Sequence, residues 1–297
     1  MENDTNTFRA GFAALIGYPN VGKSTLMNAV LGQKLSIMTH KPQTTRHQLL
    51  GIYTDSTSQI LFLDTPGVLE PKYHLQKSMM RAVERAQQQS DVLVYMADAT
   101  RKHTFTELPD LLAETRKPMF LAVNKTDAAD ANAMAYLKEL EQKFDWTEVH
   151  QISAVTSGGV SELLDGIKKQ LPESPMLYPE DMVSEKPVRF FVSELIREQL
   201  FIQYQEEIPY STTVEISSYE EGQELDRIYA NIVVNKSSQK GIIIGQKGQA
   251  IKKLGANARA EIEGFLQKQV YLELFVKVRP NWRNKKQMIN SFGYEKT

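Results

Sequence analysis

The stretch GYPNVGKST, residues 17–25, holds two glycines five positions apart, followed at once by a lysine and two hydroxyl residues. It matches the pattern G-x-x-x-x-G-K-[ST], with an apolar run before it and a helical pattern after it. In that context the backbone N–H groups of the loop point inward at a phosphate group, and the first turn of the helix adds its dipole. Lys23 would bridge the β- and γ-phosphates of a nucleotide, and Ser24 would bind Mg²⁺. The predicted phosphate loop consists of Gly17, Tyr18, Pro19, Asn20, Val21, Gly22, Lys23, Ser24 and Thr25.

A second polar motif, DTPG, ends the third apolar run of the chain. At the end of a strand, an aspartate can hold Mg²⁺ through water, and a glycine N–H can contact the γ-phosphate. The same four letters also spell an ordinary turn, but their position favours the phosphate site. The residues predicted to line this side of the site are Asp64, Thr65, Pro66, Gly67 and Val68.

The motif NKTD, residues 124–127, predicts which base is bound. Asp127 can accept hydrogen bonds from N1–H and the exocyclic amine of guanine, whereas adenine offers neither donor in that arrangement. Asn124 would brace the neighbouring loops, and the stem of Lys125 would cover the base. The dipeptide SA after the last predicted strand would contact the guanine carbonyl through a backbone N–H. A phosphate loop alone also fits an ATPase or a nucleotide kinase, but the four motifs in this order favour GTP and GDP. The predicted base pocket consists of Asn124, Lys125, Thr126, Asp127, Ser153 and Ala154.

The polar segment SIMTHKPQTTRHQLLG, residues 36–51, shows no clear period. In GTPases such a loop carries a threonine that closes on Mg²⁺ and the γ-phosphate only when GTP is present. Thr44 and Thr45 are the candidates, and resemblance to GTPases with a TTR first switch favours Thr45. The predicted Mg²⁺ ligands are therefore Ser24, Thr45 and Asp64.

The residue after Gly67 is Val68, which cannot orient an attacking water as a glutamine could. We therefore expect slow intrinsic hydrolysis, at or below roughly 10⁻⁴ to 10⁻² s⁻¹. The chain resembles GTPases in which an asparagine in the phosphate loop and a TTR switch let a K⁺ ion replace an arginine finger, which makes Asn20 the candidate K⁺ ligand. Arg46 and Arg81 are conceivable alternatives to the K⁺ ion, but each is expected to be a solvated surface arginine. The predicted catalytic residues are Lys23, Thr45, Gly67 and Asn20.

Short apolar runs alternate with helical patterns through the first half of the chain. Such alternation predicts a mostly parallel sheet covered on both faces, with ligands at the carboxyl ends of the strands. The runs at 48–53 and 59–63 are separated only by a turn-rich stretch, so they are expected to form an antiparallel hairpin. The fold class is thus an α/β P-loop GTPase domain with a mixed, mostly parallel six-stranded sheet. The predicted strands are 12–17, 48–53, 59–67, 91–98, 118–127 and 149–154, and the predicted helices are 23–31, 74–89, 107–116, 129–143 and 160–170.

Length and composition limit which classes of protein the chain can belong to. The 297 residues favour two domains, and 41% hydrophobic with 24% charged residues is ordinary globular composition. The absence of cysteine excludes disulfides and thiolate metal sites and favours an intracellular compartment. The N-terminal stretch carries acids where a signal peptide needs basic residues, and no apolar run approaches the roughly 20 residues of a membrane helix. We predict a GTP-binding domain over 1–174, a proline-rich linker over 175–187 and a second domain over 188–297.

The second domain shows a different order of elements, helix–strand–strand–helix–helix–strand–helix. Between its two central helices lies I-G-x-x-G, with glycines at 245 and 248 that let the backbone approach a nucleic acid closely. This order resembles a type II KH domain, a smaller α+β module that binds single-stranded RNA. The charge distribution also favours RNA binding. Residues 236–286 hold 12 Lys and Arg against 3 acidic residues, whereas residues 188–235 hold 3 Lys and Arg against 9 acidic residues. The predicted RNA-binding residues are Gly245, Gln246, Lys247, Gly248, Lys252, Lys253, Arg283 and Lys285.

Taken together, these motifs closely resemble the bacterial Era GTPases over nearly the whole chain, including EEIPY at 206–210 and RPNWRNKKQMI from residue 279. The resemblance implies a switch that uses GTP and Mg²⁺ and assists assembly of the small ribosomal subunit by gripping the 3′ end of 16S rRNA. It also implies a cytoplasmic protein, partly associated with the inner face of the membrane, and we expect a monomer off the ribosome. Tyr18 departs from the family, which often has a basic residue there.

Two alternatives stay open at this point. In the first, the KH domain only tethers the GTPase to RNA, and the nucleotide does not control RNA binding. In the second, the chain acts on another RNA, as GTPases of tRNA modification or of the large subunit do, although those share the N-terminal motifs and not the second domain.

Overall fold

The computed structural model describes residues 7–100, 110–113, 115–129, 140–142 and 144–295. The chain folds into two compact units. The first comprises Met1–Ser36, Thr45–Glu70 and Met79–Glu185, and the second comprises Ile37–Thr44, Pro71–Ser78 and Lys186–Thr297. Two short segments of the first half of the sequence therefore belong to the second unit, which the sequence did not lead us to expect. The predicted boundaries at 174 and 188 stay predictions.

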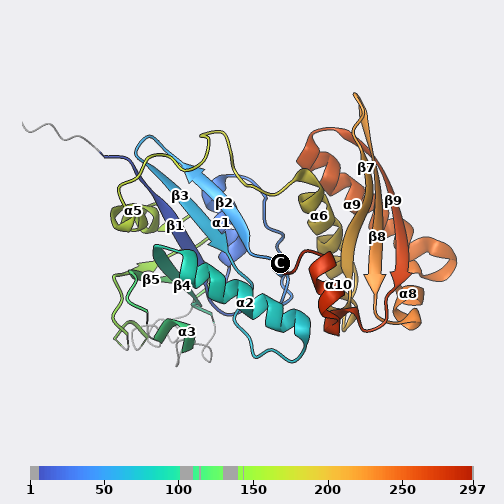
Figure 1. Cartoon of the computed structure of the whole chain (residues 1–297), viewed down its shortest axis with the longest axis horizontal. Helices are drawn as coiled ribbons and strands as arrows, with labels where there is room; N and C mark the ends of the chain where they lie inside the picture. Colours follow the sequence, from blue (N-terminus) through green and yellow to red (C-terminus); the bar gives the residue numbers. More distant parts are fainter. Residues whose placement is uncertain (1–6, 101–109, 114, 130–139, 143, 296–297) are drawn as a thin grey trace, which may run out of the picture. The chain divides into compact units, whose positions relative to one another are not determined.

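Within its described residues, the first unit is built on a six-stranded sheet with the strand order β2-β3-β1-β4-β5-β6 (Figure 1). The pair β2–β3 is antiparallel, with Leu49 opposite Asp64, and the other neighbours run parallel. The predicted α/β GTPase fold and its antiparallel hairpin are confirmed. The strands are β1 (Arg9–Ile16), β2 (Leu49–Thr54), β3 (Ser58–Asp64), β4 (Val92–Asp98), β5 (Met119–Asn124) and β6 (Glu148–Gln151).

Helices cover both faces of this sheet. Leu50 and Ile52 of β2 belong to a cluster with Val83 and Ala86 of α2, so that face carries α2. Gly51 between them must point the other way, and a Cβ there would lie 2.8 Å from side-chain atoms of α1. Gly51 thus lets α1 approach the opposite face closely. The described helices are α1 (Lys23–Leu31), α2 (His74–Gln89), α3 (Asp110–Ala113) and α5 (Val160–Gln170), with the short helix η1 (Thr126–Ala128).

Two predicted helices fall partly or mostly outside the described residues. Of the helix expected over 107–116, residues 110–113 form α3, and residues 115 and 116 are described but not helical. Of the one expected over 129–143, the described residues are 129 and 140–142. The predicted helices at 23–31, 74–89 and 160–170 coincide with α1, α2 and α5.

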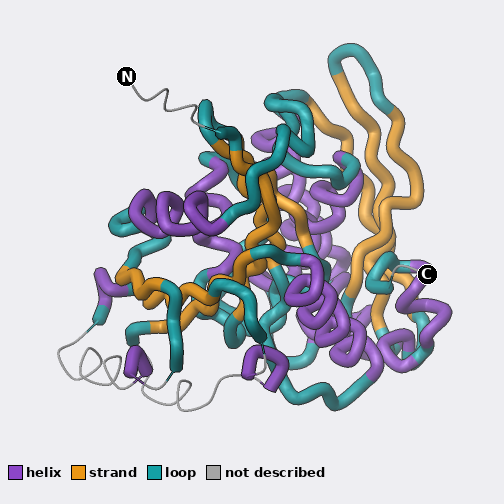
Figure 2. The backbone as a smooth tube through the Cα atoms, turned by 60° about the vertical axis from the view of Figure 1, so that its left-hand side comes forward, coloured by secondary structure: helices purple, strands orange, loops and turns teal. Residues whose placement is uncertain are grey.

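The second unit contains a three-stranded sheet among its described residues, ordered β7-β8-β9, with β7–β8 antiparallel and β8–β9 parallel. This is the order of elements expected of a type II KH domain, with one addition, the short helix α7. Figure 1 shows α6 and α9 side by side along the sheet, and Figure 2 shows the backbone turned by 60° and coloured by helix, strand and loop. The elements are α6 (Val188–Gln203), α7 (Ile208–Ser211), β7 (Thr213–Glu220), β8 (Leu225–Val234), α8 (Ser237–Ile244), η2 (Gln246–Gly248), α9 (Gln249–Leu266), β9 (Gln269–Val278), η3 (Trp282–Asn284) and α10 (Lys286–Ser291).

An apolar core fixes α6 against this sheet. Val192 and Ile196 of α6 are fully buried in one cluster with Ile228 of β8 and Ile262 of α9. Further along the chain, Trp282 is fully buried and donates its indole N–H to the carbonyl of Ser211, 2.9 Å away. Among the described helices of both units, none is long and apolar enough to cross a membrane.

Candidate nucleotide site and RNA-binding loop

The phosphate loop joins β1 to α1 and turns through left-handed backbone conformations. Asn20 has φ 67° and Gly22 has φ 100°. A Cβ on Gly22 would lie 2.1 Å from Nδ2 of Asn124, so only glycine fits at this close approach. The loop therefore depends on glycine both for its conformation and for its contact with β5.

Lys23 begins α1 and is almost fully buried. Its Nζ donates to the carbonyls of Gly17 and Tyr18, both at 3.0 Å. Burial lowers the pKa of Lys23 to about 8, although the nearby carboxylate of Asp64 acts in the opposite direction. A buried cation held only by two carbonyls is well suited to exchange them for phosphate oxygens.

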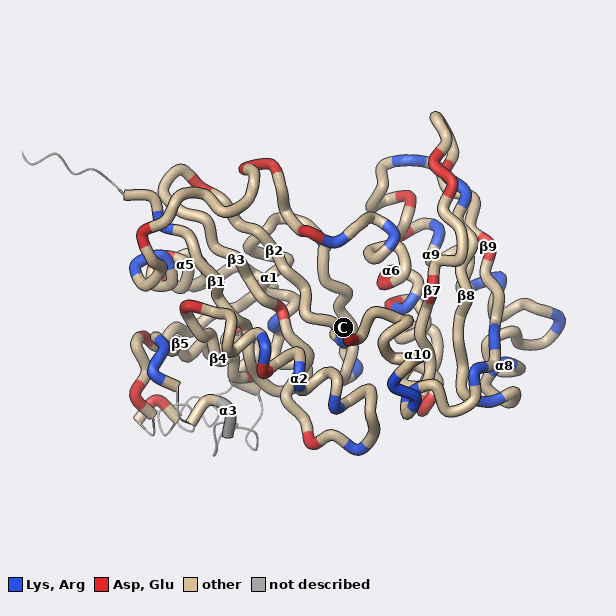
Figure 3. The backbone as a smooth tube through the Cα atoms, viewed as in Figure 1, with Lys and Arg blue, Asp and Glu red and all other residues tan. Residues whose placement is uncertain are grey.

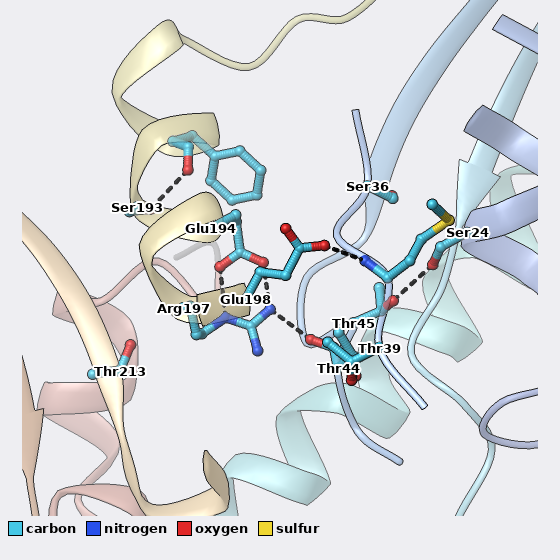
Figure 4. Close-up of polar contacts among 12 residues, drawn as sticks. Ser24, Ser36, Thr39, Thr44, Thr45, Ser193, Glu194, Arg197, Glu198 and Thr213 are labelled. Atoms are coloured by element: carbon cyan, nitrogen blue, oxygen red, sulfur yellow. Dashed lines mark hydrogen bonds and ion pairs between the residues drawn. The ribbon is translucent and has the colours of Figure 1, made fainter. Parts of the chain in front are cut away.

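The predicted metal ligands lie together. Ser24 Oγ donates to Asp64 Oδ2 at 2.7 Å. It also lies 2.9 Å from Thr45 Oγ1 (Figure 4). Asp64 is fully buried, and its Oδ1 has no hydrogen-bond partner among the described residues. Burial raises the pKa of Asp64, while the hydrogen bond from Ser24 opposes that rise. Two hydroxyls and a carboxylate are hard oxygen donors, which fit Mg²⁺.

The described part of the chain holds no cluster of three or more His, Cys, Asp and Glu that could bind a metal. Ser36, which we did not predict, donates a second hydrogen bond to Asp64 Oδ2 at 2.8 Å. It follows no motif, so nothing in the sequence pointed to it.

The DTPG segment packs directly on the phosphate loop. Val68 N donates to Gly17 O at 3.0 Å, and Thr65 Oγ1 donates to Leu15 O at 2.7 Å. A Cβ on Gly67 would lie 2.6 Å from the backbone nitrogen of Pro19. The second motif is thus fixed against the first by its own backbone.

The two candidate threonines of the first switch occupy different surroundings. The Thr44 hydroxyl is buried and donates to Lys41 O at 2.8 Å, whereas Thr45 Oγ1 faces Ser24. This geometry supports Thr45 as the residue that approaches the metal. Arg46, expected at the surface, is only 3% exposed, so that expectation was wrong, whereas Arg81 is exposed.

Asn124 connects three loops of the predicted base pocket. Its Nδ2 donates to Val21 O at 2.8 Å, and its Oδ1 accepts from Ala154 N at 2.9 Å. The amide of Ala154 is therefore already engaged, as is that of Ser153, which donates to Gly158 O at 2.9 Å. These two residues shape the pocket, and their contact with the guanine carbonyl stays a prediction.

Lys125 and Asp127 flank the pocket differently. Lys125 Nζ donates to Asn20 O at 2.7 Å and forms an ion pair with Asp98 Oδ2 at 2.6 Å. Asp98 is fully buried, which tends to raise its pKa, but the hydrogen bonds from Lys125 and Thr100 hold that pKa below its usual range. Asp127 lies exposed on η1. Asp98 was missed, although it ends β4 in register with Asn124 and the strand-end rule could have found it.

The G-x-x-G turn of the second unit has an unusual backbone. Gly245, Lys247 and Gly248 all have positive φ, at 71°, 48° and 77°. A Cβ on Gly245 would lie 2.6 Å from the Cβ of Ala250 in α9. Gln246 lies in the same turn, η2, and the exposed lysines here include Lys247, Lys252 and Lys253. Basic residues gather around α8 and in the segment that leads into α10 (Figure 3).

Arg283 is engaged elsewhere within the second unit. Its guanidinium lies 4.7 Å from the ring centre of Tyr73, and Nη1 donates to Tyr210 O at 3.2 Å. Lys285 is exposed at the start of α10. Their part in RNA binding stays a prediction, with less support for Arg283 because packing already occupies its side chain.

The bridging position of Asn124 leads to a testable prediction. Replacing Asn124 with Ala leaves the buried groups Val21 O and Ala154 N without their partner. We expect this change to lower the free energy of unfolding of the first unit by about 1–3 kcal/mol. Urea unfolding followed by circular dichroism would measure it. Gln170→Ala, at an exposed position at the end of α5, is the control, and an equal midpoint for both variants would contradict the bridging role.

Comparisons with known proteins agree with this geometry. A family model described as "50S ribosome-binding GTPase" matches residues 12–125, and one described as "KH domain" matches residues 207–283. GTPase Era of Geobacter metallireducens is 40% identical over 294 residues, which cover 97% of this chain and 99% of that protein. The chloroplastic GTPase ERA-like protein of Arabidopsis thaliana is 44% identical, over 96% of this chain and 69% of its own.

Solved structures give the same result. An Era variant of Aquifex aeolicus bound to GDP.AlF4- superposes with a TM-score of 0.92 at 38% identity, covering 97% of this chain and 100% of the other. An Era structure in complex with MgGDPNP and nucleotides 1506–1542 of 16S ribosomal RNA matches with the same TM-score, identity and coverage. Because these similarities extend over both units, this chain belongs to the Era family of GTPases.

Proposed function

We propose that the chain is a slowly hydrolysing GTP switch that binds 16S rRNA near its 3′ end through the KH domain and assists assembly of the small ribosomal subunit. The observation that carries this proposal is that one chain combines the Ser24–Asp64–Thr45 cluster beside a phosphate loop with an exposed, left-handed G-x-x-G turn. The Era relative solved with MgGDPNP and 16S rRNA supports the same pair of ligands.

Each residue of the phosphate site has a separate role in this proposal. Lys23 gives up the carbonyls of Gly17 and Tyr18 and neutralises the β- and γ-phosphates. Mg²⁺, when bound by Ser24, Thr45 and Asp64, supplies further positive charge to the same phosphates. The N–H of Gly67 would contact the γ-phosphate, and the apolar side chain of Val68 offers no group to orient the attacking water. Hydrolysis without help is therefore slow.

Asp127 is proposed to select guanine, and this can be tested by changing its hydrogen-bond pattern. Asp127→Asn turns one acceptor into a donor, which suits the 2-oxo group of xanthine and opposes the 2-amino group of guanine. We expect the variant to lose at least about 100-fold in GTP affinity and to prefer xanthosine triphosphate. Titrations with both nucleotides would measure the change.

The matched control for this experiment is Asp145→Asn, an exposed aspartate away from the NKTD motif. It should leave both affinities unchanged. If Asp127→Asn kept its preference for GTP, the base would be read by other groups.

We also propose that K⁺ stimulates hydrolysis through Asn20, whose backbone carbonyl is fixed by Lys125 at 2.7 Å. Phosphate release should be faster in K⁺ than in Na⁺, and Asn20→Gly should remove the difference. Glycine is the appropriate replacement because residue 20 has φ 67°, which glycine adopts without strain. Equal rates of the unchanged protein in the two salts would disprove the role of K⁺.

RNA binding is proposed to use the turn at residues 245–248 together with Lys247, Lys252 and Lys253. Each lysine–phosphate contact on a single strand contributes about 0.7 to the slope of log affinity against log salt concentration. The double change Lys252→Gln and Lys253→Gln should therefore weaken binding to the 3′-terminal 16S rRNA segment and reduce that slope by about 1.4. Lys169→Gln, on the exposed side of α5, is the control.

The same RNA titration separates a coupled switch from a tether. If GTP controls the KH domain, RNA affinity differs between the GDP-bound protein and the protein bound to a non-hydrolysable GTP analogue. By linkage, RNA then changes the ratio of GTP-analogue to GDP affinity by the same factor. Identical RNA affinities in the two states would leave only tethering. Equal affinity for unrelated RNAs would favour an action on another RNA.

The place of action follows from the proposed partner. A factor of small-subunit assembly works in the cytoplasm, and the family resemblance extends this to partial association with the inner face of the membrane. We propose that the chain is a monomer when it is off the ribosome.

A further inference from the structure

We propose that Gln203 and Tyr204, at the C-terminal end of α6, are positioning residues of the RNA-binding turn at residues 245–248. Both lie outside the G-x-x-G motif, and their side chains hold the backbone on either side of it. This inference rests on the proposed function as an RNA-binding protein and deepens it. Every contact that carries it lies within the second unit, to which α6 and the turn both belong.

The hydroxyl of Tyr204 connects α6 to the helix before the turn. Tyr204 is 7% exposed, and its hydroxyl donates to the carbonyl oxygen of Ile243 at 2.8 Å. Ile243 is fully buried and lies in the last turn of α8. Because a carbonyl in the last turn of a helix lacks an amide partner within that helix, Tyr204 satisfies a buried group that α8 leaves open.

Gln203 connects the same end of α6 to the helix after the turn. Its Nε2 donates to the carbonyl of Ala250, in the first turn of α9, at 2.9 Å and to the hydroxyl of Tyr204 at 2.9 Å. The Tyr204 oxygen accepts one hydrogen bond and donates another, so the two side chains form a continuous chain from Ala250 to Ile243. Burial raises the pKa of Tyr204, although the hydrogen bond from Gln203 opposes that rise, so the hydroxyl keeps its proton.

The end of α6 is itself fixed independently of the turn. Tyr204 packs in one apolar cluster with Ile232 of β8. Lys41, from the segment 37–44 of the same unit, donates through Nζ to the carbonyls of Phe201 and Tyr204. These carbonyls also lie where a helix leaves its own groups without partners. Gln203 and Tyr204 therefore extend from a support that the sheet and Lys41 hold in place.

The turn needs such a support because its backbone is strained. Three of its four residues have positive φ, and one of them, Lys247 at φ 48°, is not a glycine. Such a conformation is unfavourable for a residue with a Cβ and persists only where the surrounding structure imposes it. The two hydrogen bonds from α6 act two residues before Gly245 and two residues after Gly248. They fix where α8 ends and where α9 begins, which constrains the turn between them.

This placement affects RNA binding because the backbone of a G-x-x-G turn, more than its side chains, approaches the nucleic acid. A turn that is already held in its binding conformation loses little conformational freedom when the RNA binds. Without the contacts from α6, part of the binding free energy would be used to order the turn. RNA affinity should therefore depend on two side chains that do not belong to the motif.

The first test is Tyr204→Phe, which keeps the ring in its apolar cluster and removes the hydroxyl. We expect affinity for the 3′-terminal 16S rRNA segment to fall about fivefold, because binding must then order the turn. The matched control is Tyr294→Phe in the same unit, where the tyrosine is 5% exposed and its hydroxyl lies 2.8 Å from Thr213 Oγ1. The control should keep its RNA affinity within about twofold, as fluorescence anisotropy would show.

The pair of variants separates positioning from a general loss of stability. Each loses one buried hydroxyl, so both should show a similar decrease in the midpoint of urea unfolding. Hydrogen exchange gives a local readout, since the amides of Gly245 and Gly248 donate to Gly241 O and Gly245 O at 2.9 and 3.3 Å. These two amides should exchange faster in Tyr204→Phe than in Tyr294→Phe. Equal RNA affinity in the two variants would overturn the proposal, and so would equal exchange of the two amides.

If Tyr204→Phe impaired folding, Gln203→Met would take its place. Gln203 is only half-buried, and methionine keeps its length while it removes the donor to Ala250 and Tyr204. RNA affinity should fall at least about twofold, with faster exchange at Gly245 and Gly248. No loss of RNA affinity in this variant would reject the proposal. Failure of the unchanged protein to bind the 16S rRNA segment would instead refute the proposed function itself.

Discussion

The nucleotide site depends on a carboxylate that has no contact with solvent. Asp64 is fully buried at the end of β3, where desolvation alone favours its neutral form. Hydrogen bonds from Ser24 and Ser36 stabilise its charge through one oxygen, and the other oxygen has no described partner. Such a group is expensive to bury unless a cation completes it. The hydroxyls of Ser24 and Thr45 lie beside this carboxylate, and we propose them as further ligands of that cation.

The loops around this carboxylate are also fixed to one another by hydrogen bonds, an ion pair and close backbone approaches. Asn124 ties the phosphate loop to the loop after β6, and Lys125 ties it to the buried Asp98. Gly22 and Gly67 permit approaches that any Cβ would prevent. The pocket is therefore preorganised by protein–protein hydrogen bonds, so binding loses little energy to rearrangement of the backbone.

Much of this was predictable because the relevant signals are local. Strands of apolar residues predicted the sheet and the hairpin, and the motifs pointed to Ser24 and Asp64, whose side chains lie together in the structure. Burial of Arg46 and the roles of Ser36 and Asp98 were not predicted. Each depends on which residues from distant parts of the sequence lie nearby in the fold, and neither the composition nor the spacing of the motifs gives that information. The inclusion of residues 37–44 and 71–78 in the second unit belongs to the same class.

Those two segments lie in the first half of the sequence but have their contacts in the second unit. Residues 37–44 are held by Arg197, Glu198 and the end of α6, and residues 71–78 are held by His74 N to Asn284 Oδ1 and by the ring of Tyr73 under Arg283. Each segment adjoins a nucleotide motif, one through Thr45 and the other through the chain that follows Gly67. Whether these segments make RNA binding depend on the nucleotide is what the comparison of RNA affinity in the two nucleotide states decides, because a tether would leave the two affinities equal. The apolar side chain of Val68 offers no group to orient a water, which agrees with the slow hydrolysis that we propose.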